Sequence, residues 1–476
     1  MVERERAQLP VSPSGSTRSR QMKGAQNERI MVGALTALGA GIGGYVLGRL
    51  ERIRFYGRKL YAGRTGRNIS SLYVLQSSGY LLSLILVPYL VRVLGAAGYG
   101  VIAFCQGLMA YAAVLVSYGF DWSGTREVAA RRDDPEHVSK VVSSIVACKL
   151  ILAVISGTVL FGVVVIVPSL HAQWRLFGIL YVGVAAGALF PSYLFQGLER
   201  IAWMAAISLC SRVLMVAGIF LLVTRPEHFV RYAAFITAQS VTLAIIGLVV
   251  AVVRLQFRPN MPSIEDVRMR FREGWVLFLS SAATSLITAG NSFLLGLFAD
   301  FSAVGVYAAA ERIMQVASGF LGPIGQTFYP RSSYLAKTSR SLLQANAIRL
   351  FKIMALIGGG FAVVLLVSAG PVVDVVLGSG FARSAPVLRI LACFVLVNAI
   401  TNVLGVQLLL PLGYDRIFLL ILAVSGVANL VLAAVLIPRF QEKGMAAAVM
   451  ASGALVLALQ GGVVLRRNLL GLARAS

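Results

Sequence analysis

Apolar residues follow one another in long, nearly unbroken runs between residues 69 and 466. A helix needs roughly 20 apolar residues to cross a hydrocarbon core of about 30 Å. Twelve runs reach that length, and they cover residues 69–94, 97–120, 141–168, 174–197, 202–224, 229–256, 274–299, 303–330, 346–369, 386–411, 414–438 and 443–465. We therefore predict an all-α integral membrane protein with twelve transmembrane helices.

Lysine and arginine occur mainly in alternate connections between these runs. The connections richest in positive charge are residues 121–140, 254–273 and 331–345. All three fall on the same side of the membrane as the basic stretch before the first run and as Arg466 and Arg467 after the last. Because cytoplasmic loops carry an excess of Lys and Arg, we predict that both ends of the membrane core are cytoplasmic.

The core divides into two halves of equal span number. We predict an N-lobe of six spans at 68–257, a cytoplasmic linker at 258–273, a C-lobe of six spans at 274–466 and a cytoplasmic tail at 467–476. An even number of spans in each half gives parallel repeats, here arranged around a central cavity. A constant offset of 205 residues aligns Gly100 with Gly305 and Arg126 with Arg331, which adds weak support.

The segment before the core allows several interpretations. Residues 1–28 are polar and rich in Ser, Arg and Gln, which predicts a disordered tail. Residues 29–67 hold a glycine-rich apolar stretch followed by a basic one. This second segment is an extra span, an interfacial helix, or a stretch upstream of the true start, and the sequence leaves the three open.

Composition agrees with a membrane protein and excludes other classes. The chain has 476 residues, of which 58% are hydrophobic and 13% charged, and its formal net charge is +24. The positive-inside rule, together with a genome that favours arginine, is one explanation of this charge, and attraction to an anionic substrate or lipid is the functional alternative. The basic residues are spread over many short loops, so nucleic-acid binding is not expected. The three histidines lie far apart, and we expect no metal site, no cofactor and no catalytic constellation.

A few ionisable residues lie inside the predicted spans, where each costs roughly 2.5–3.5 kcal/mol and is therefore expected to face protein or water. They are Arg92, Lys149, Arg212, Glu311, Arg312 and Lys352. Arg212 lies near the middle of its span, whereas Arg92, Lys149 and Lys352 lie nearer to span ends, where a long side chain also reaches the interface. Glu311 is predicted to be either an ion-pair partner or a site that couples transport to a proton or cation.

The buried cations indicate the chemistry of a ligand. A guanidinium stays charged and presents a donor fork that matches phosphate oxygens, so we predict a phosphate or diphosphate head group. Asn398 and Asn402 share one helix face and are predicted to contact sugar hydroxyls, with hydrogen bonding between helices as the alternative. The predicted substrate contacts in the cavity are Arg92, Lys149, Arg212, Arg312, Lys352, Asn398 and Asn402.

Several stretches resemble a known family. The first is Pro88–Gly95 (PYLVRVLG), followed by Gly98–Gly100. Further stretches are Tyr118–Phe120 with Thr125–Ala129, Leu194–Arg200, Val304–Arg312, Phe328–Arg331 and Leu377–Phe381. Their order and spacing resemble polysaccharide flippases of the Wzx type, in the polysaccharide transporter family of the multidrug/oligosaccharidyl-lipid/polysaccharide exporter superfamily. The resemblance covers residues 68–465.

This resemblance implies two six-helix lobes around a cavity that opens alternately to the two sides of the bacterial inner membrane. It implies movement of undecaprenyl-diphosphate-linked oligosaccharide from the cytoplasmic to the periplasmic leaflet, for O-antigen, capsule or exopolysaccharide synthesis. A polysaccharide polymerase and a chain-length regulator are the protein partners it suggests. The alternatives are a drug or cation extruder of the same superfamily, a membrane polymerase or ligase of the same pathway, and a scaffold that does not transport.

Overall fold

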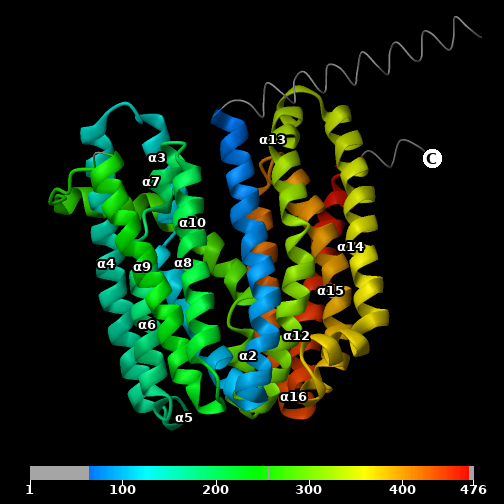
Figure 1. Ribbon diagram of the computed structural model, residues 1–476. Helices are drawn as coiled ribbons and strands as arrows, with labels where there is room; N and C mark the ends of the chain where they lie inside the picture. Colours follow the sequence, from blue (N-terminus) through cyan, green and yellow to red (C-terminus); the bar gives the residue numbers. More distant parts are fainter. Residues whose placement is uncertain (1–63, 256, 471–476) are drawn as a thin grey trace, which may run out of the picture. The chain divides into compact units, whose positions relative to one another are not determined.

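The computed structural model describes residues 64–255 and 257–470. The predicted tail of residues 1–28 and residues 29–63 of the glycine-rich segment lie outside the described residues. The described residues form helices joined by short turns, and none of them forms a strand (Figure 1). The α-helices are α2 (Arg64–Ser117), α3 (Phe120–Ala130), α4 (Pro135–Ile166), α5 (Pro168–His171), α6 (Trp174–Leu189), α7 (Ser192–Gly197), α8 (Ile201–Leu222), α9 (Phe229–Leu255), α10 (Ile264–Thr288), α11 (Asn291–Phe298), α12 (Phe301–Gly319), α13 (Gly322–Thr338), α14 (Arg340–Val376), α15 (Ser384–Leu404) and α16 (Asp415–Arg466).

Among the described residues, eight helices are long and apolar enough to cross a membrane. Two of them, α2 and α16, each contain one residue with non-helical backbone angles, Gly95 at φ 67° and Gln441 at φ 48°. Each of these helices therefore consists of two halves joined at a kink. The segment from α10 to α13 is not among the eight, and it carries charged side chains such as Arg270 and Glu311.

Several predicted loops are helical. The predicted loop 121–140 contains most of α3 and the start of α4, and the predicted linker 258–273 contains the first turns of α10. Residues 331–345 are helical except for Ser339. The caps explain these starts, because Asp134 caps α4, and Ser263 and Asp266 form a reciprocal capping box at α10. Hydropathy reports where a helix leaves the hydrocarbon, whereas capping decides where the helix begins.

Two predicted spans are broken. The run 274–299 is divided into α10 and α11 at Gly290, whose φ of 78° favours glycine. The run 303–330 is divided into α12 and α13 by Phe320 and Leu321. A break inside a membrane segment frees backbone groups, and such breaks are tolerated where they are buried in protein or line a cavity.

The helices of the unit Asn68–Ser476 pack in two groups. Helices α3, α4, α6, α7, α8 and α9 pack mainly against one another, and α12, α14, α15 and α16 do the same. Helix α10 contacts both groups, since it packs against α3 and α4 as well as against α16. Helix α2 approaches α12 so closely that a Cβ at Gly100 would lie 1.7 Å from the carbonyl oxygen of Phe301. Glycine is therefore required at this crossing.

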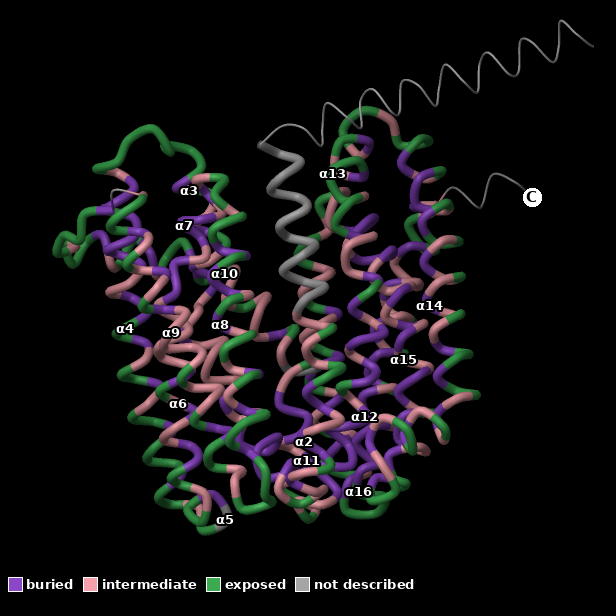
Figure 2. Tube along the Cα trace, in the orientation of Figure 1, coloured by how far each residue is buried: buried purple, intermediate pink, exposed green. Residues whose placement is uncertain are grey.

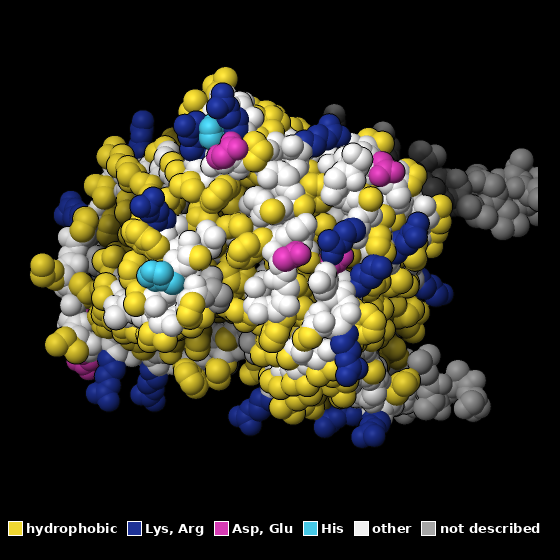
Figure 3. All heavy atoms as spheres, turned by 90° about the horizontal axis from the view of Figure 1, so that it is seen from below, with side chains coloured by type: hydrophobic (Ala, Val, Ile, Leu, Met, Phe, Trp, Pro, Cys, Tyr) yellow, Lys and Arg dark blue, Asp and Glu magenta, His cyan; other side chains and the backbone are white. Residues whose placement is uncertain are grey.

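The outward faces of the helices are apolar. On α16, the exposed residues Leu420, Val424, Val427, Val431 and Val435 follow the spacing of one helix face. Figure 2 shows exposed residues on the outer helices and buried residues between helices. On the end seen from below, Lys and Arg side chains lie both around the edge and across the face (Figure 3). Apolar outward faces and charged ends are typical of a protein in lipid.

Candidate functional site

A polar cavity of about 600 Å³ lies between the two groups of helices. Its wall includes parts of α2, α4, α6, α9, α11 and α12. Four charged side chains line it, Asp121 and Lys149 on one side, and Glu311 and Arg312 on the other. A charged cavity inside an apolar helical protein provides a polar environment for a solute that lipid would exclude.

Lys149 and Asp121 form an ion pair on one wall of the cavity. The Lys149 Nζ lies 3.1 Å from the Asp121 Oδ1, and its side chain is 2% exposed, whereas that of Asp121 is 39% exposed. The Ser192 hydroxyl donates to the same carboxylate oxygen at 2.9 Å, and the ammonium lies 5.2 Å from the ring centroid of Tyr193. The charge of Asp121 is therefore balanced by a cation from another helix.

Glu311 on α12 has a different environment on the opposite wall. Its Oε1 accepts hydrogen bonds from the Tyr307 hydroxyl at 3.0 Å and from the Asn291 side-chain amide at 3.2 Å. Both donors are neutral. The neighbouring Arg312 bonds to Gln315 instead, at 3.1 Å, because adjacent residues of a helix point about 100° apart.

A chain of hydrogen bonds continues from Glu311 through Asn291 on α11 to α16. The Asn429 amide donates to the Asn291 Oδ1 at 3.3 Å, and the Ser452 hydroxyl donates to the Asn429 Oδ1 at 3.3 Å. Asn429 and Ser452 are fully buried, and Asn291 is 3% exposed. Glu311 is thus connected through hydrogen bonds to both halves of α16, at Asn429 and at Ser452.

Arg212 and Arg312 line a second cavity of about 570 Å³ beside the first. The two cavities share Gln106, Ile236, Arg312 and Gln315 in their walls, so they adjoin at α12. A Cβ at Gly79 would lie 2.5 Å from the Arg212 Nη1. Glycine at this position of α2 leaves the room that the guanidinium occupies.

The other predicted contacts lie elsewhere. Arg92 is exposed and donates to the carbonyl oxygen of Val375 near the end of α14, and Lys352 is exposed on α14. Asn398 and Asn402 are half-buried on α15, and the Asn402 Oδ1 would lie 2.9 Å from a Cβ at Gly325 of α13. These four residues do not line the two charged cavities. Arg92 and Asn402 instead lie at contacts between helices.

Sequence reasoning missed Asp121. It falls in the predicted connection 121–140, which directly follows the apolar run 97–120. Helix α3 begins at Phe120, however, and places Asp121 next to Lys149 of α4. A lysine as deeply buried as Lys149 needs a partner, so the buried cation was the signal that a carboxylate lies nearby.

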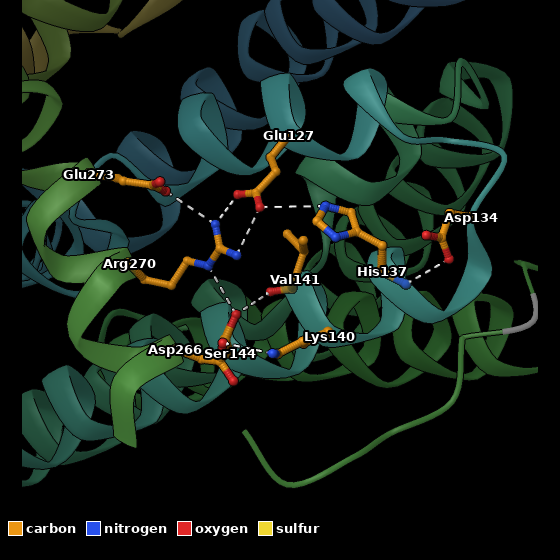
Figure 4. A network of polar contacts seen from close by, with 9 residues as sticks. All are labelled: Glu127, Asp134, His137, Lys140, Val141, Ser144, Asp266, Arg270 and Glu273. Carbon is orange, nitrogen blue, oxygen red and sulfur yellow. Dashed lines mark hydrogen bonds and ion pairs between the residues drawn. The ribbon is translucent and has the colours of Figure 1, made fainter. Parts of the chain in front are cut away.

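A second network joins α10 to α3 and α4 outside the cavities (Figure 4). The buried Arg270 forms a two-pronged ion pair with Glu127, and it also donates to Glu273 at 3.2 Å and to Ser144 at 3.1 Å. His137 lies 3.5 Å from the same Glu127 carboxylate. Arg270 therefore holds the first turns of α10 against the first group of helices.

Asp266 extends this network. Its carboxylate accepts from the Ser263 hydroxyl at 2.7 Å and lies 3.1 Å from the Lys140 Nζ. The hydrogen bond from Ser263, followed by that from Lys140, lowers the pKa of Asp266 below its usual value. The start of α10 is thus fixed by both a cap and an ion pair.

Residues 65–336 match the model of the family described as polysaccharide biosynthesis protein. The chain belongs to this family. A relative from Escherichia coli (strain K12), named "Putative O-antigen transporter", is 30% identical over 394 residues, which cover 83% of this chain and 95% of that relative. The resemblance predicted from the sequence motifs is confirmed.

Two solved structures share the fold. The lipid II flippase MurJ in an inward closed conformation aligns with a TM-score of 0.67 at 11% identity, over 83% of this chain and 87% of that chain. The inward-facing conformation of a multidrug resistance MATE family transporter of the MOP superfamily also aligns with a TM-score of 0.67, at 15% identity, over 86% and 99%. The described residues therefore share the fold of these two proteins.

Proposed function

We propose that this protein flips undecaprenyl-diphosphate-linked oligosaccharide from the cytoplasmic to the periplasmic leaflet by alternating access. The observation that carries the proposal is the placement of Arg212 and Arg312 on the wall of one cavity. Two guanidinium groups match the charge and the oxygen geometry of a diphosphate. The family and the transporter name of the E. coli relative support a transporter rather than an enzyme.

The two cavities suit the two polar parts of such a substrate. The second cavity would hold the diphosphate between Arg212 and Arg312. The first, larger one offers neutral polar groups for sugar hydroxyls, including Gln106, Ser240 and Asn291. The lipid tail would remain in apolar surroundings, which the outward helix faces supply.

For the membrane arrangement we infer twelve spans in two groups of six, with both ends of residues 68–466 cytoplasmic. The helices support this number when they are counted in the following way. The two halves of α2 and of α16 count separately, whereas α10 with α11, and α12 with α13, each count as one span. The Arg270 network would then lie at the cytoplasmic end. A reporter fused after Arg467 should be active in the cytoplasm, and activity confined to the periplasm would reject this topology.

We infer further that Glu311 couples transport to a proton gradient. Its hydrogen-bond donors are neutral and it forms no ion pair with a described residue, so a proton on Glu311 would break no such pair. The bacterial inner membrane supplies such a gradient. A polysaccharide polymerase and a chain-length regulator of the same pathway are the partners we propose, since they would use the flipped lipid.

Reconstitution tests the function directly. The full chain is placed in proteoliposomes with undecaprenyl-diphosphate oligosaccharide, and a membrane-impermeant reagent that oxidises sugars reports which leaflet holds the head group. With the protein, we expect the reagent to oxidise the whole pool of lipid-linked sugar. Without it, we expect the reagent to oxidise only the outer leaflet's share, about half of the pool. Equal protection in both samples would reject the proposal, and transport of a cationic drug by the same vesicles would favour the extruder alternative.

A further inference from the structure

An apolar groove runs beside the charged cavities. Its volume is about 570 Å³, and α2, α10 and α16 form its walls. The lining is apolar except for the Tyr111 hydroxyl, Ser285 and Arg416, and it includes Phe278, Leu419 and Leu420. Since Leu420 is 63% exposed, the groove opens toward the lipid-facing side of α16.

The groove and the first cavity share a wall. On α2, Ala110 and Ala113 line the cavity, whereas Tyr111 and Val114 line the groove. The Tyr111 ring lies against Gly290 at the α10–α11 break, where a Cβ would approach the ring to 2.2 Å. The Tyr111 hydroxyl is buried and has no hydrogen-bond partner among the described residues. A tyrosine ring and a broken helix thus separate the two spaces.

One charged residue lies at the rim of the groove. Arg416 is in the first turn of α16, is exposed, and forms no hydrogen bond or ion pair with any described residue. A cation in the first turn is opposed by the helix dipole, so Arg416 does not stabilise the helix from this position. Its guanidinium is available to an anion at the membrane surface.

We propose that this groove is the loading site for the polyprenyl tail of the substrate, with Arg416 contacting the diphosphate as the lipid arrives. This inference rests on the proposed function and names where the tail binds. A lipid whose head group enters the cavity needs an apolar path for its tail beside that cavity, and the shared wall at Tyr111 provides it. An ordinary phospholipid lacks the diphosphate and the oligosaccharide that the adjoining cavities are proposed to hold.

The test uses two probes with the same sugar-diphosphate head, one with an undecaprenyl tail and one with a short geranyl tail. Binding to the purified full chain is measured for Ala282→Phe, which fills the groove, and for Ala434→Phe, which adds the same ring on an exposed face of α16. We expect Ala282→Phe to weaken undecaprenyl binding about tenfold and to leave geranyl binding unchanged, since a few methylene groups lose contact. Ala434→Phe should change neither.

Arg416→Gln forms the second arm, with Arg340→Gln at the start of α14 as its control. We expect Arg416→Gln to weaken both probes about fivefold, since both carry the diphosphate. Should Ala282→Phe fail to fold, Ala423→Phe fills the same groove from α16.

Each outcome is decisive. Equal effects of Ala282→Phe on the two probes, or no effect, would overturn the loading site while leaving the proposed function intact. Displacement of the undecaprenyl probe by phosphatidylglycerol at equal concentration would assign the groove to ordinary lipid. A wild-type chain that binds neither probe would overturn the proposed function, and this inference with it.

Discussion

Two carboxylates face the same cavity from opposite walls, and their partners differ. Asp121 meets the ammonium of Lys149, whereas Glu311 meets the neutral side chains of Tyr307 and Asn291. A carboxylate next to a cation keeps its charge, because losing it would leave the cation unpaired. A carboxylate held by neutral donors can take up a proton without that cost. The first wall is therefore an electrostatic anchor, and we infer that the second responds to protons.

Breaking the anchor should give the largest effect on stability. Asp121→Asn leaves the 2%-exposed Lys149 without a counter-ion, and we expect it to cost about 3 kcal/mol. Lys149→Met leaves Asp121, which is 39% exposed to the cavity, and should cost only about 1 kcal/mol. Thermal unfolding of both variants in one detergent checks the order. Equal losses of stability in the two variants would mean that the buried Lys149 does not depend on Asp121 more than Asp121 depends on Lys149.

Removing the Arg212 guanidinium from the second cavity should strongly reduce transport with little loss of stability. Arg212→Ala deletes the fork proposed for the diphosphate, and we expect export to fall at least about tenfold, since a charge-assisted bond is lost. Arg212→Lys should restore transport only in part, because the fork is missing. Arg349→Ala, at an exposed position of α14 outside both cavities, is the control. Full export by Arg212→Ala at normal protein level would remove Arg212 from the site.

Removing the charge of Glu311 tests whether the second wall responds to protons. Glu311→Gln keeps an oxygen that accepts from Tyr307 and breaks no ion pair of the described residues, so we expect a loss of stability below about 1 kcal/mol. Substrate binding should remain, whereas transport should no longer respond to a proton gradient. Both are measured on one purified sample. A clearly destabilised protein whose transport still follows the gradient would end the coupling hypothesis.

The smallest expected effects on transport come from deleting one hydroxyl on each wall. Ser192→Ala and Tyr307→Phe each remove a donor to a carboxylate, and each should cost about 1 kcal/mol. They should differ in function: Tyr307→Phe should move the pH dependence of transport, and Ser192→Ala should not. Identical pH profiles for the two variants would show that the walls do not differ in the way proposed.

The sequence by itself determined the class of the protein. Long apolar runs have no stable place in water, so the membrane character and the helical fold follow from hydropathy alone, and the ordered motifs placed the chain in its family. It also singled out Arg212 and Glu311, because an ionisable group inside an apolar run is costly wherever it lies. These conclusions need only the energy of single residues in lipid.

The tertiary structure alone decided which groups meet. Lys149 is paired with Asp121 across 28 positions, and Arg270 with Glu127 across 143. Hydropathy carries no information on such pairs, since it describes each residue against solvent rather than against another helix. For the same reason Asn398 and Asn402 were predicted in the cavity but lie on α15 away from both charged cavities. Helix rotation and packing set these contacts, and both depend on the whole assembly of helices rather than on any one run.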